Sequence, residues 1–290
     1  MSQHEIENTP GDRIQYREYK IILQPQHFTT AQAFPDFWEI VRKTAKKFDV
    51  KVHENEDAFH SQVREVLFFD TAGFDLYKNH FILRLRTDYR NGWPQGIPEL
   101  TFKYRHPDFK QSAAVDVRPA TPGGIARIKF KEELLPLRET LGGVRSIFSH
   151  NCVLAKPREG LEMALKDLAA TFPAVHQLGA DRESPVRLVN DIAVEEIQAD
   201  VGELHFGHGF HGKTTIAVWR MRKYERAFCG EFAFQCKFDN EDELHKSSLK
   251  RTDDFYKALQ AAAPDWVSLG TTKTALVYNL SASGGGSHSE

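Results

Sequence analysis

The stretch VREVLFFDTAGFDLYKNHFILRLR, residues 63–86, decides the fold. Near its end, side chains of two kinds alternate, with Phe81, Leu83 and Leu85 against Ile82, Arg84 and Arg86. Because successive side chains of a strand point to opposite faces, this alternation predicts a strand with one apolar face and one face that carries two guanidinium groups. For a single strand, a solvated outer face is the simplest explanation of such charges.

The same alternation recurs along the chain. We expect strands near residues 15–23, 62–70, 80–89, 98–106, 113–118, 190–206, 213–224, 231–238 and 271–278. In PELTFKYRH, Lys103 and Arg105 alternate with apolar residues, and in TIAVWRMRKY we assign Arg220 and Arg222 to the polar face, opposite Trp219. Short connections between neighbouring strands predict a mostly antiparallel sheet.

Helical patterns are fewer than strand patterns. Apolar residues at helical spacing predict helices over 31–48, 159–171 and 241–262, and a further short helix is expected over 131–141 despite Pro136. The fold class is therefore α+β, mainly antiparallel β, with helices packed outside the sheet or at its ends.

The polar strand faces together are basic, whereas the whole chain has a formal net charge of −2. Ten bases lie on them: Lys20, Arg84, Arg86, Lys103, Arg105, Arg118, Arg220, Arg222, Lys237 and Lys273. Five acids accompany these bases: Glu18, Asp88, Glu99, Asp116 and Glu231. A β-sandwich would leave these charges in water, whereas a barrel would place them in its lumen and would need an anionic guest, because an unpaired buried ion costs several kcal/mol. Arginine and lysine suit phosphate oxygens, so a polyphosphate chain is the natural guest.

Composition restricts the function classes. The near-neutral net charge of the chain argues against a general nucleic-acid binder. No run approaches 18 consecutive apolar residues and the start lacks a secretory signal, so no membrane partner is expected. Three cysteines without CxxC spacing, Cys152, Cys229 and Cys236, are typical of reduced thiols in the cytoplasm.

The chain resembles the CYTH superfamily, the triphosphate tunnel metalloenzymes. Members of this family show a strand that ends in a Tyr-Phe-Asp-Thr-like element, a short helix, and a strand that ends in Arg-x-Arg. Phe69-Asp70-Thr71 and Arg84-Leu85-Arg86 are similar to these elements, and ELTFKY, GEFAFQCKF and TTKTALVY are similar to later family strands. The resemblance runs in order along residues 15–278, and it implies an eight-stranded closed tunnel with a charged lumen and flanking helices.

The resemblance also implies a site. Phosphate-binding residues would be Lys20, Arg84, Arg86, Lys103, Arg118, Arg220, Lys237 and Lys273. Glu18 and Glu231 would hold Mg²⁺ or Mn²⁺, and Lys20 and Glu18 would be catalytic. The implied activity is metal-dependent hydrolysis of a triphosphate-containing small molecule or of polyphosphate, with water as the nucleophile.

The sequence departs from the family pattern in its first strand. The family reads Glu-x-Glu-x-Lys, whereas this chain has Tyr16 at the first Glu position, ahead of Glu18 and Lys20. Ala233 and Gln235 also stand where the late strand often carries acids. A non-catalytic polyphosphate- or nucleotide-binding module, a nucleotide cyclase on the same fold, and a β-sandwich binding partner therefore stay as alternatives.

Two further features complete the expectations. His205, His208 and His211 lie in a Gly-rich segment that is interpreted as a turn between strands more readily than as a metal site.

Residues 1–13 are expected to be a disordered lead, 14–280 a single domain and 281–290 a flexible Gly/Ser tail. Neither the organic group on the triphosphate nor the oligomeric state follows from the sequence.

Overall fold

The computed structural model describes residues 13–120, 126–157, 163–240 and 244–280, in which the strands are mostly antiparallel and accompanied by six α-helices. By contacts between Cα atoms the chain divides into two units. The first unit contains residues 64–131 and 147–193, and the second contains 15–63, 132–146 and 194–290. The predicted α+β class with mostly antiparallel strands is confirmed. The single domain over residues 14–280 stays a prediction, and the expected tail and nearly all of the expected lead lie outside the described residues.

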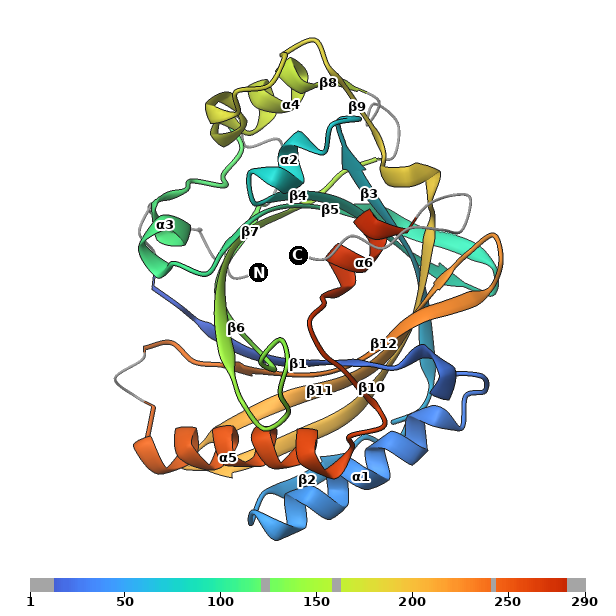
Figure 1. Ribbon diagram of the computed structural model, residues 1–290, viewed down its shortest axis with the longest axis vertical. Helices are drawn as coiled ribbons and strands as arrows, with labels where there is room; N and C mark the ends of the chain where they lie inside the picture. The colour runs from blue at the N-terminus through green and yellow to red at the C-terminus, as the bar shows by residue number, and fades with distance from the viewer. Residues whose placement is uncertain (1–12, 121–125, 158–162, 241–243, 281–290) are drawn as a thin grey trace. The chain divides into compact units, whose positions relative to one another are not determined.

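The second unit is built on an antiparallel sheet (Figure 1). Its strands follow the order β2 (Lys51–Glu54), β10 (Val194–Gly207), β11 (Phe210–Met221), β12 (Arg226–Lys237) and β1 (Tyr16–Leu23), with β13 (Val267–Ser268) paired to β1. A turn at His208, flanked by Gly207 and Gly209 at positive φ, joins β10 to β11 as the sequence predicts. His208 stacks on His245, whereas His205 and His211 lie beside Glu203.

Helices α1 (Ala33–Lys47) and α5 (Lys246–Ala262) cover one face of this sheet, which confirms two predicted helices. Aromatic rings fill the space between them and the strands. Phe232 and Phe234 of β12 lie 5.5 Å from Phe37 and 6.0 Å from Phe255, and Tyr19 stacks on Phe234 at 4.6 Å between ring centroids. These side chains are buried, so one face of β1 and β12 forms the core and the alternate side chains point to the other face.

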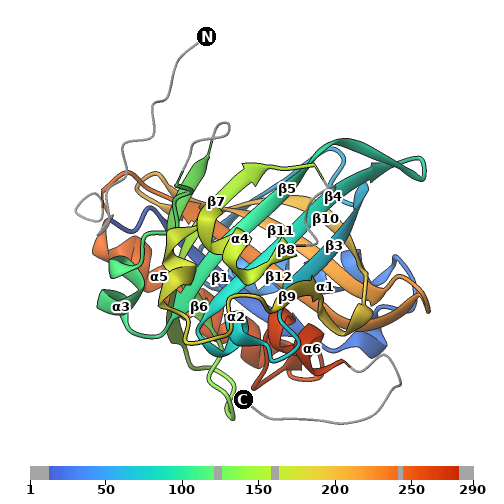
Figure 2. The ribbon, with the colours of Figure 1, turned by 90° about the horizontal axis from the view of Figure 1, so that it is seen from above.

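The first unit contains the stretch that opens the sequence argument (Figure 2). Its strands follow the order β7 (Arg145–Ala155), β5 (Trp93–His106), β4 (Phe81–Arg90), β3 (Ser61–Asp70), β9 (Pro185–Leu188) and β8 (Met163–Ala164). Helix α4 (Leu165–Thr171) and the 3₁₀ turns η2 (Pro173–Gln177) and η3 (Val189–Asp191) belong to this unit, and η1 (Pro25–His27) to the second. Helix α4 confirms residues 165–171 of the helix predicted over 159–171, whereas Met163 and Ala164 of that range form β8.

Asp70 explains the Phe-Asp-Thr element. Asp70 is 2 % exposed and is paired in register with Arg187 at the end of β3, and its carboxylate accepts backbone N–H groups of the short helix α2 (Asp75–Lys78) that comes next. Oδ1 accepts from Leu76 at 2.9 Å and Oδ2 from Tyr77 at 3.0 Å. Because the first N–H groups of a helix have no partner inside it, Asp70 fixes the turn between β3 and β4.

Packing in the first unit confirms the apolar face predicted for residues 80–89. Phe81, Leu83 and Leu85 are buried in a core with β5, where Phe81 stacks on Phe102 at 5.3 Å and Phe102 stacks on Phe172 at 4.3 Å. Register pairs Arg84 with Thr101, so both lie on the opposite face from this core.

Three predicted elements are wrong. The helix expected over 131–141 is instead β6 (Arg127–Leu135), whose side chains alternate, and Pro136 follows its end. The strand expected over 113–118 is replaced by α3 (Phe109–Ala114), which Asp108 caps by accepting from Gln111 N at 2.9 Å. The strand expected over 271–278 is α6 (Lys273–Asn279), capped by Thr272. At β6 the alternation of side chains with a period of two produces a strand, and at α3 and α6 an N-capping residue starts a helix. Each of these signals outweighed the pattern on which the prediction was based.

No helix among the described residues has the length and apolarity needed to cross a membrane. The three cysteines are free and buried.

Gly230 is tightly enclosed, and this predicts a stability change. A Cβ at this position would lie 2.1 Å from the ring of Phe28 and 3.0 Å from Leu23 Cβ. Gly230→Ala should therefore lower the free energy of unfolding by about 1–3 kcal/mol in urea denaturation. Gly179→Ala, whose Cβ meets nothing within 4 Å, is the control and should change the free energy of unfolding by only a few tenths of a kcal/mol. Equal changes in the two variants would contradict the tight fit.

The buried thiols should be unreactive in the folded chain. Burial raises the pKa of Cys152 to about 12, and burial raises the pKa of Cys229 and of Cys236 as well. Thiolate is the reactive form, so at pH 8 Ellman's reagent should label none of them in native protein and all three in denaturant. Fast labelling of any thiol under native conditions would show that its surroundings are open.

Candidate functional site

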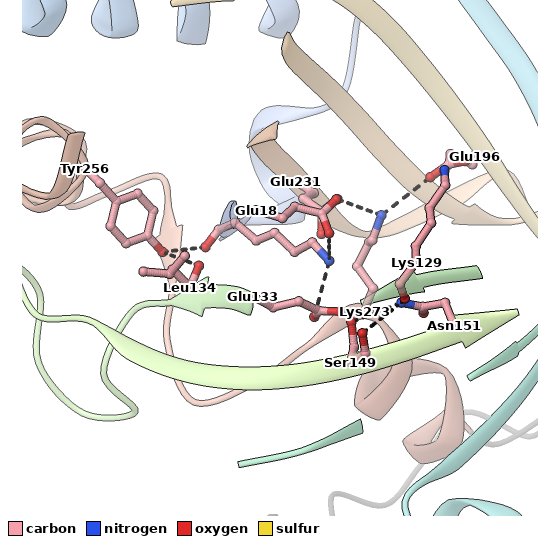
Figure 3. A network of polar contacts seen from close by, with 11 residues as sticks. Glu18, Lys129, Glu133, Leu134, Ser149, Asn151, Glu196, Glu231, Tyr256 and Lys273 are labelled. Atoms are coloured by element: carbon pink, nitrogen blue, oxygen red, sulfur yellow. Dashed lines mark hydrogen bonds and ion pairs between the residues drawn. The ribbon is translucent and has the colours of Figure 1, made fainter. Parts of the chain in front are cut away.

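Two lysines of the second unit are each held between carboxylates (Figure 3). The ammonium of Lys20 lies 3.0 Å from Glu18 and 3.3 Å from Glu133. The ammonium of Lys273 lies 2.7 Å from Glu231 and 3.5 Å from Glu196. We call this set the carboxylate–lysine cluster: Glu18, Lys20, Glu133, Glu196, Glu231 and Lys273.

Local structure brings the cluster together on the sheet face opposite the aromatic core. Glu18 and Lys20 alternate with the buried Tyr19 on β1. Register pairs Glu231 of β12 with Ile22, which places Glu231 on the same face as Lys20. Lys273 is the first residue of α6, where the Thr272 hydroxyl accepts from Ala275 N at 3.2 Å and so fixes the start of the helix.

The backbone around Lys20 is anchored from the helix side. The hydroxyl of Tyr256, on α5, lies 2.6 Å from the carbonyl oxygen of Lys20 and 3.2 Å from that of Leu134 (Figure 3). Tyr256 is fully buried, and its ring packs edge-on against Tyr19 at 5.2 Å. The side chain of Lys20 therefore projects from a rigid segment of β1.

Burial makes the charges of the cluster interdependent. Glu196 is 1 % and Glu133 is 2 % exposed, and both are too buried to be hydrated fully. Burial alone would lower the pKa of Lys20, but the carboxylates of Glu133, Glu18 and Glu231 outweigh it, so that pKa lies above its ordinary value. Lys20 is consequently an ammonium at neutral pH.

Trp219 supports the second lysine. Its indole N–H donates to Glu196 at 2.8 Å, and the ammonium of Lys273 lies 4.4 Å from the centroid of its ring. A cation over an indole face is attracted by the ring quadrupole, so Trp219 fixes Glu196 and holds Lys273 at the same time.

The donor chemistry of the cluster fits a hard divalent cation. Four carboxylates and two ammonium groups leave an excess of two negative charges, and Mg²⁺ prefers carboxylate oxygens with phosphate and water completing its shell. Among the described residues no group of three or more His, Cys, Asp or Glu side chains is arranged to hold a metal ion. Since ammonium groups lie between the carboxylates, one or two of these carboxylates would be the protein ligands of such a cation.

The first unit carries a second charged surface, which we call the basic face. It lies on the sheet face opposite the core, where Arg84 and Arg86 of β4 pair in register with Thr101 and Glu99 of β5. On β6, Ile128 and Phe130 are buried, so the alternate residues point to the same side as Arg84. The seven bases of the basic face are Arg84, Arg86, Lys103, Arg105, Arg127, Lys129 and Lys131.

Two ion pairs join described residues on and near the basic face. Glu99 pairs with Arg127, and Asp88, beyond a bulge after Arg86, pairs with Arg64 at 2.8 Å. Six of the seven bases are half-buried, the exception being Arg127, which is exposed. An excess of positive charge with restricted hydration favours an anionic ligand.

The structure separates some residues that we expected on one surface. Glu18, Lys20, Glu231 and Lys273 meet in the cluster, and Arg84, Arg86 and Lys103 share the basic face. Arg220 lies on the opposite side of its sheet from the cluster, paired with Glu195. Lys237 is exposed at the end of β12. Arg118 pairs with Asp116 at 2.8 Å after α3, beside a hollow of about 160 Å³.

Arg220 was misplaced because both faces of β11 are apolar at this point. Trp219 pairs in register with Cys229, and Ala217 with Glu231, so Trp219 lies on the face of the cluster. Val218 and Arg220 therefore point to the helix-covered face, which is the reverse of the prediction. A one-residue error in phase moves every side chain of a strand to the other face.

Sequence reasoning missed several members of these surfaces. The predicted helix over 131–141 hid Lys131 and Glu133, and Lys129, just before it, was assigned to no strand, although ARIKFKEELL has the alternation of a strand. Glu196 was missed because VEEIQAD carries acids on both faces, and only register with Trp219 selects it.

No family model and no curated protein matches the chain. Among solved structures it is similar to HpAC1 from Hippeastrum, described as a candidate adenylyl cyclase with a dominant triphosphatase activity, at 14% identity over 91% of this chain and 95% of that chain, with a TM-score of 0.44. A candidate adenylate cyclase from Bacillus halodurans matches at 12% identity over 90% and 95%, TM-score 0.38. One from Vibrio parahaemolyticus matches at 11% over 91% and 99%, TM-score 0.37. At these values the likeness carries no argument for function.

The charge balance of the cluster predicts strong coupling between its members. Lys273→Met removes the ammonium that lies between Glu196 and Glu231, and should lower the free energy of unfolding by about 2–4 kcal/mol in urea denaturation. Glu231→Gln should lower the free energy of unfolding less in the Lys273→Met background than in the wild type. The difference between the two effects, which is the coupling energy, should be about 1–3 kcal/mol.

The control is Lys250→Met, because Lys250 is 76% exposed in its pair with Asp254 and should contribute only a few tenths of a kcal/mol. If Lys273→Met were no more destabilising than this control, the cluster would be hydrated and not interdependent.

Proposed function

We propose that the chain binds a linear triphosphate, inorganic or organic, and hydrolyses its phosphoanhydride with the help of a divalent metal. The observation that supports this proposal is the separation of charge between two strand faces. One carries the seven bases of the basic face, and the other carries four carboxylates around two lysines. Phosphate requires the first kind of surface, and a phosphate-bound Mg²⁺ requires carboxylates.

The order of motifs in the sequence supports the same proposal. Phe69-Asp70-Thr71 followed by Arg84-Leu85-Arg86 is the pattern on which the resemblance to triphosphate tunnel enzymes is based. The closed eight-stranded tunnel that this resemblance implies is part of the proposal.

In this proposal the bases of the first unit hold the phosphates. Arg84 and Arg86 stand two residues apart on one strand face, with Lys103 on the neighbouring strand. Guanidinium groups bind phosphate oxygens in a bidentate manner, and lysines add point charges. Positioning and neutralisation of charge are the main requirements of phosphoryl transfer, because little covalent chemistry is left for the protein.

Glu18 and Glu231 would hold Mg²⁺ or Mn²⁺, which when bound would neutralise charge on the phosphate oxygens. Lys20 stays protonated because of its carboxylate neighbours, so its role is to hold and neutralise a phosphate and not to accept a proton. The attacking water forms a bond to the terminal phosphorus while the bridging P–O bond breaks, and its proton passes to a carboxylate of the cluster, for which Glu18 is our choice. Orthophosphate and the shortened chain are the products.

Replacement of the paired arginines tests binding. Arg84→Met and Arg86→Met keep much of the stem while removing the charge, and each should weaken tripolyphosphate binding by about 2–4 kcal/mol in calorimetry. Stability without ligand should stay close to wild type, because removal of one base lowers the repulsion on the basic face. Arg182→Met, on an exposed loop of the same unit, is the matched control. Unchanged affinity in both variants would refute the phosphate-binding role.

Turnover separates hydrolysis from binding alone. Tripolyphosphate, ATP and thiamine triphosphate are each incubated with Mg²⁺ or Mn²⁺, and orthophosphate and cyclic nucleotide are measured. Orthophosphate release that is lost in Glu18→Gln supports hydrolysis. Tight binding without product supports a non-catalytic module, for which the lysines between the carboxylates and Tyr16 at the first Glu position are the favouring observations.

A further inference from the structure

A cavity of about 970 Å³ lies in the second unit and contains no residue of the carboxylate–lysine cluster. Its sheet side is formed by Ile197, Val218 and Ala227, which lie on the face that α1 covers, opposite to the cluster. Three aromatic side chains form its other walls: Phe28, Phe34 and Phe59. We call this cavity the aromatic pocket.

The walls of the aromatic pocket are preformed. Phe28 sits against Gly230, where a Cβ would lie 2.1 Å from its ring, so only glycine leaves room for it. The same ring makes edge contacts with Phe34 at 5.8 Å and with Trp266 at 6.0 Å. A ring held on three sides does not need to be reordered when a ligand arrives, which lowers the cost of binding.

The opposite wall is open to solvent. Phe59, in the turn before β3, is 39% exposed, although it lines the pocket together with buried Phe34 and Val218. A large aromatic side chain left in water at the wall of a hollow is a surface that a ligand would cover.

Charge in the aromatic pocket is balanced. Arg220 is paired with Glu195, and the remaining charged residues in the lining are Glu225 and Arg226, one of each sign, at the rim. Hydroxyl groups of Thr29 and Thr30 add neutral hydrogen-bonding partners there. A net-neutral rim gives no preference to an anion, in contrast to the basic face.

We propose that the aromatic pocket binds an uncharged, flat aromatic molecule of small-molecule size. The volume lies at the upper end of the range for such sites, which are typically about 300–1,000 Å³, mostly apolar and marked by a few polar groups. Stacking against Phe28 and Phe59 selects a planar ring system, and the balanced rim selects a neutral one. In this proposal Arg220 lines a site for a neutral ligand, whereas the family resemblance implied a phosphate-binding role for it.

Nile red, a neutral planar dye whose fluorescence rises in apolar surroundings, is the probe. Wild-type protein should bind it saturably with a stoichiometry of one. Ala227→Trp fills the pocket from β12, and Phe59→Ala removes an exposed wall without touching the core. Each should weaken dye binding roughly tenfold or more, which corresponds to about 1.4 kcal/mol.

Matched controls are Ala261→Trp, on the exposed side of α5, and Leu141→Ala, whose residue is 38% exposed, both in the same unit. Their dye affinity should equal that of wild type, and melting curves report whether every variant is folded. Absence of saturable binding, or equal affinity in Phe59→Ala and Leu141→Ala, would overturn the proposal. Tripolyphosphate affinity should be unchanged in Phe59→Ala, so this test is independent of the proposed hydrolysis.

Discussion

The ammonium of Lys20, held between Glu18 and Glu133, is the interaction on which the second unit depends. On either side of it along β1, Tyr19 and Ile21 enter the aromatic core, and its own carbonyl oxygen accepts from the Tyr256 hydroxyl of α5. The strand is therefore fixed on both faces at once. Each carboxylate beside Lys20 would be costly to bury alone. The ion pairs of Lys20 and the packing of the core therefore depend on each other.

This arrangement explains how one fold carries two surfaces of opposite chemistry. In both units the apolar face of the strands packs under helices or neighbouring turns, and the charged residues of the cluster and of the basic face lie on the other face. Around Lys20 and Lys273, ammonium groups lie between carboxylates and offset part of their negative charge. Around Arg84 and Lys103 the strand register brings bases together, and the proposed triphosphate would add negative charge there.

The sequence predicted those elements of the fold that depend on local alternation. Phe81, Leu83 and Leu85 take the core face of β4 as expected, because an alternating strand with one apolar side has only one favourable register. It did not predict β6, where a charged run suits a helix as well as a strand, nor α6, where Thr272 caps a helix whose residues also suit a strand. Among the residues of the cluster, Lys20 and Glu18 could be placed together from the sequence, because both lie on β1. Glu133 and Glu196 depend on which strands and side chains become neighbours, which is tertiary information that no single segment contains.

The position of Lys273 in the chain has a consequence for how the protein is made. All four carboxylates of the cluster and Lys20 precede it in the sequence, and Lys273 opens the last described helix, after β12 and α5. A nascent chain emerging from the ribosome therefore holds these carboxylates with only one of the two ammonium groups until α6 has been translated. Because a buried carboxylate is costly without a nearby cation, the folded cluster is complete only after α6 has been made.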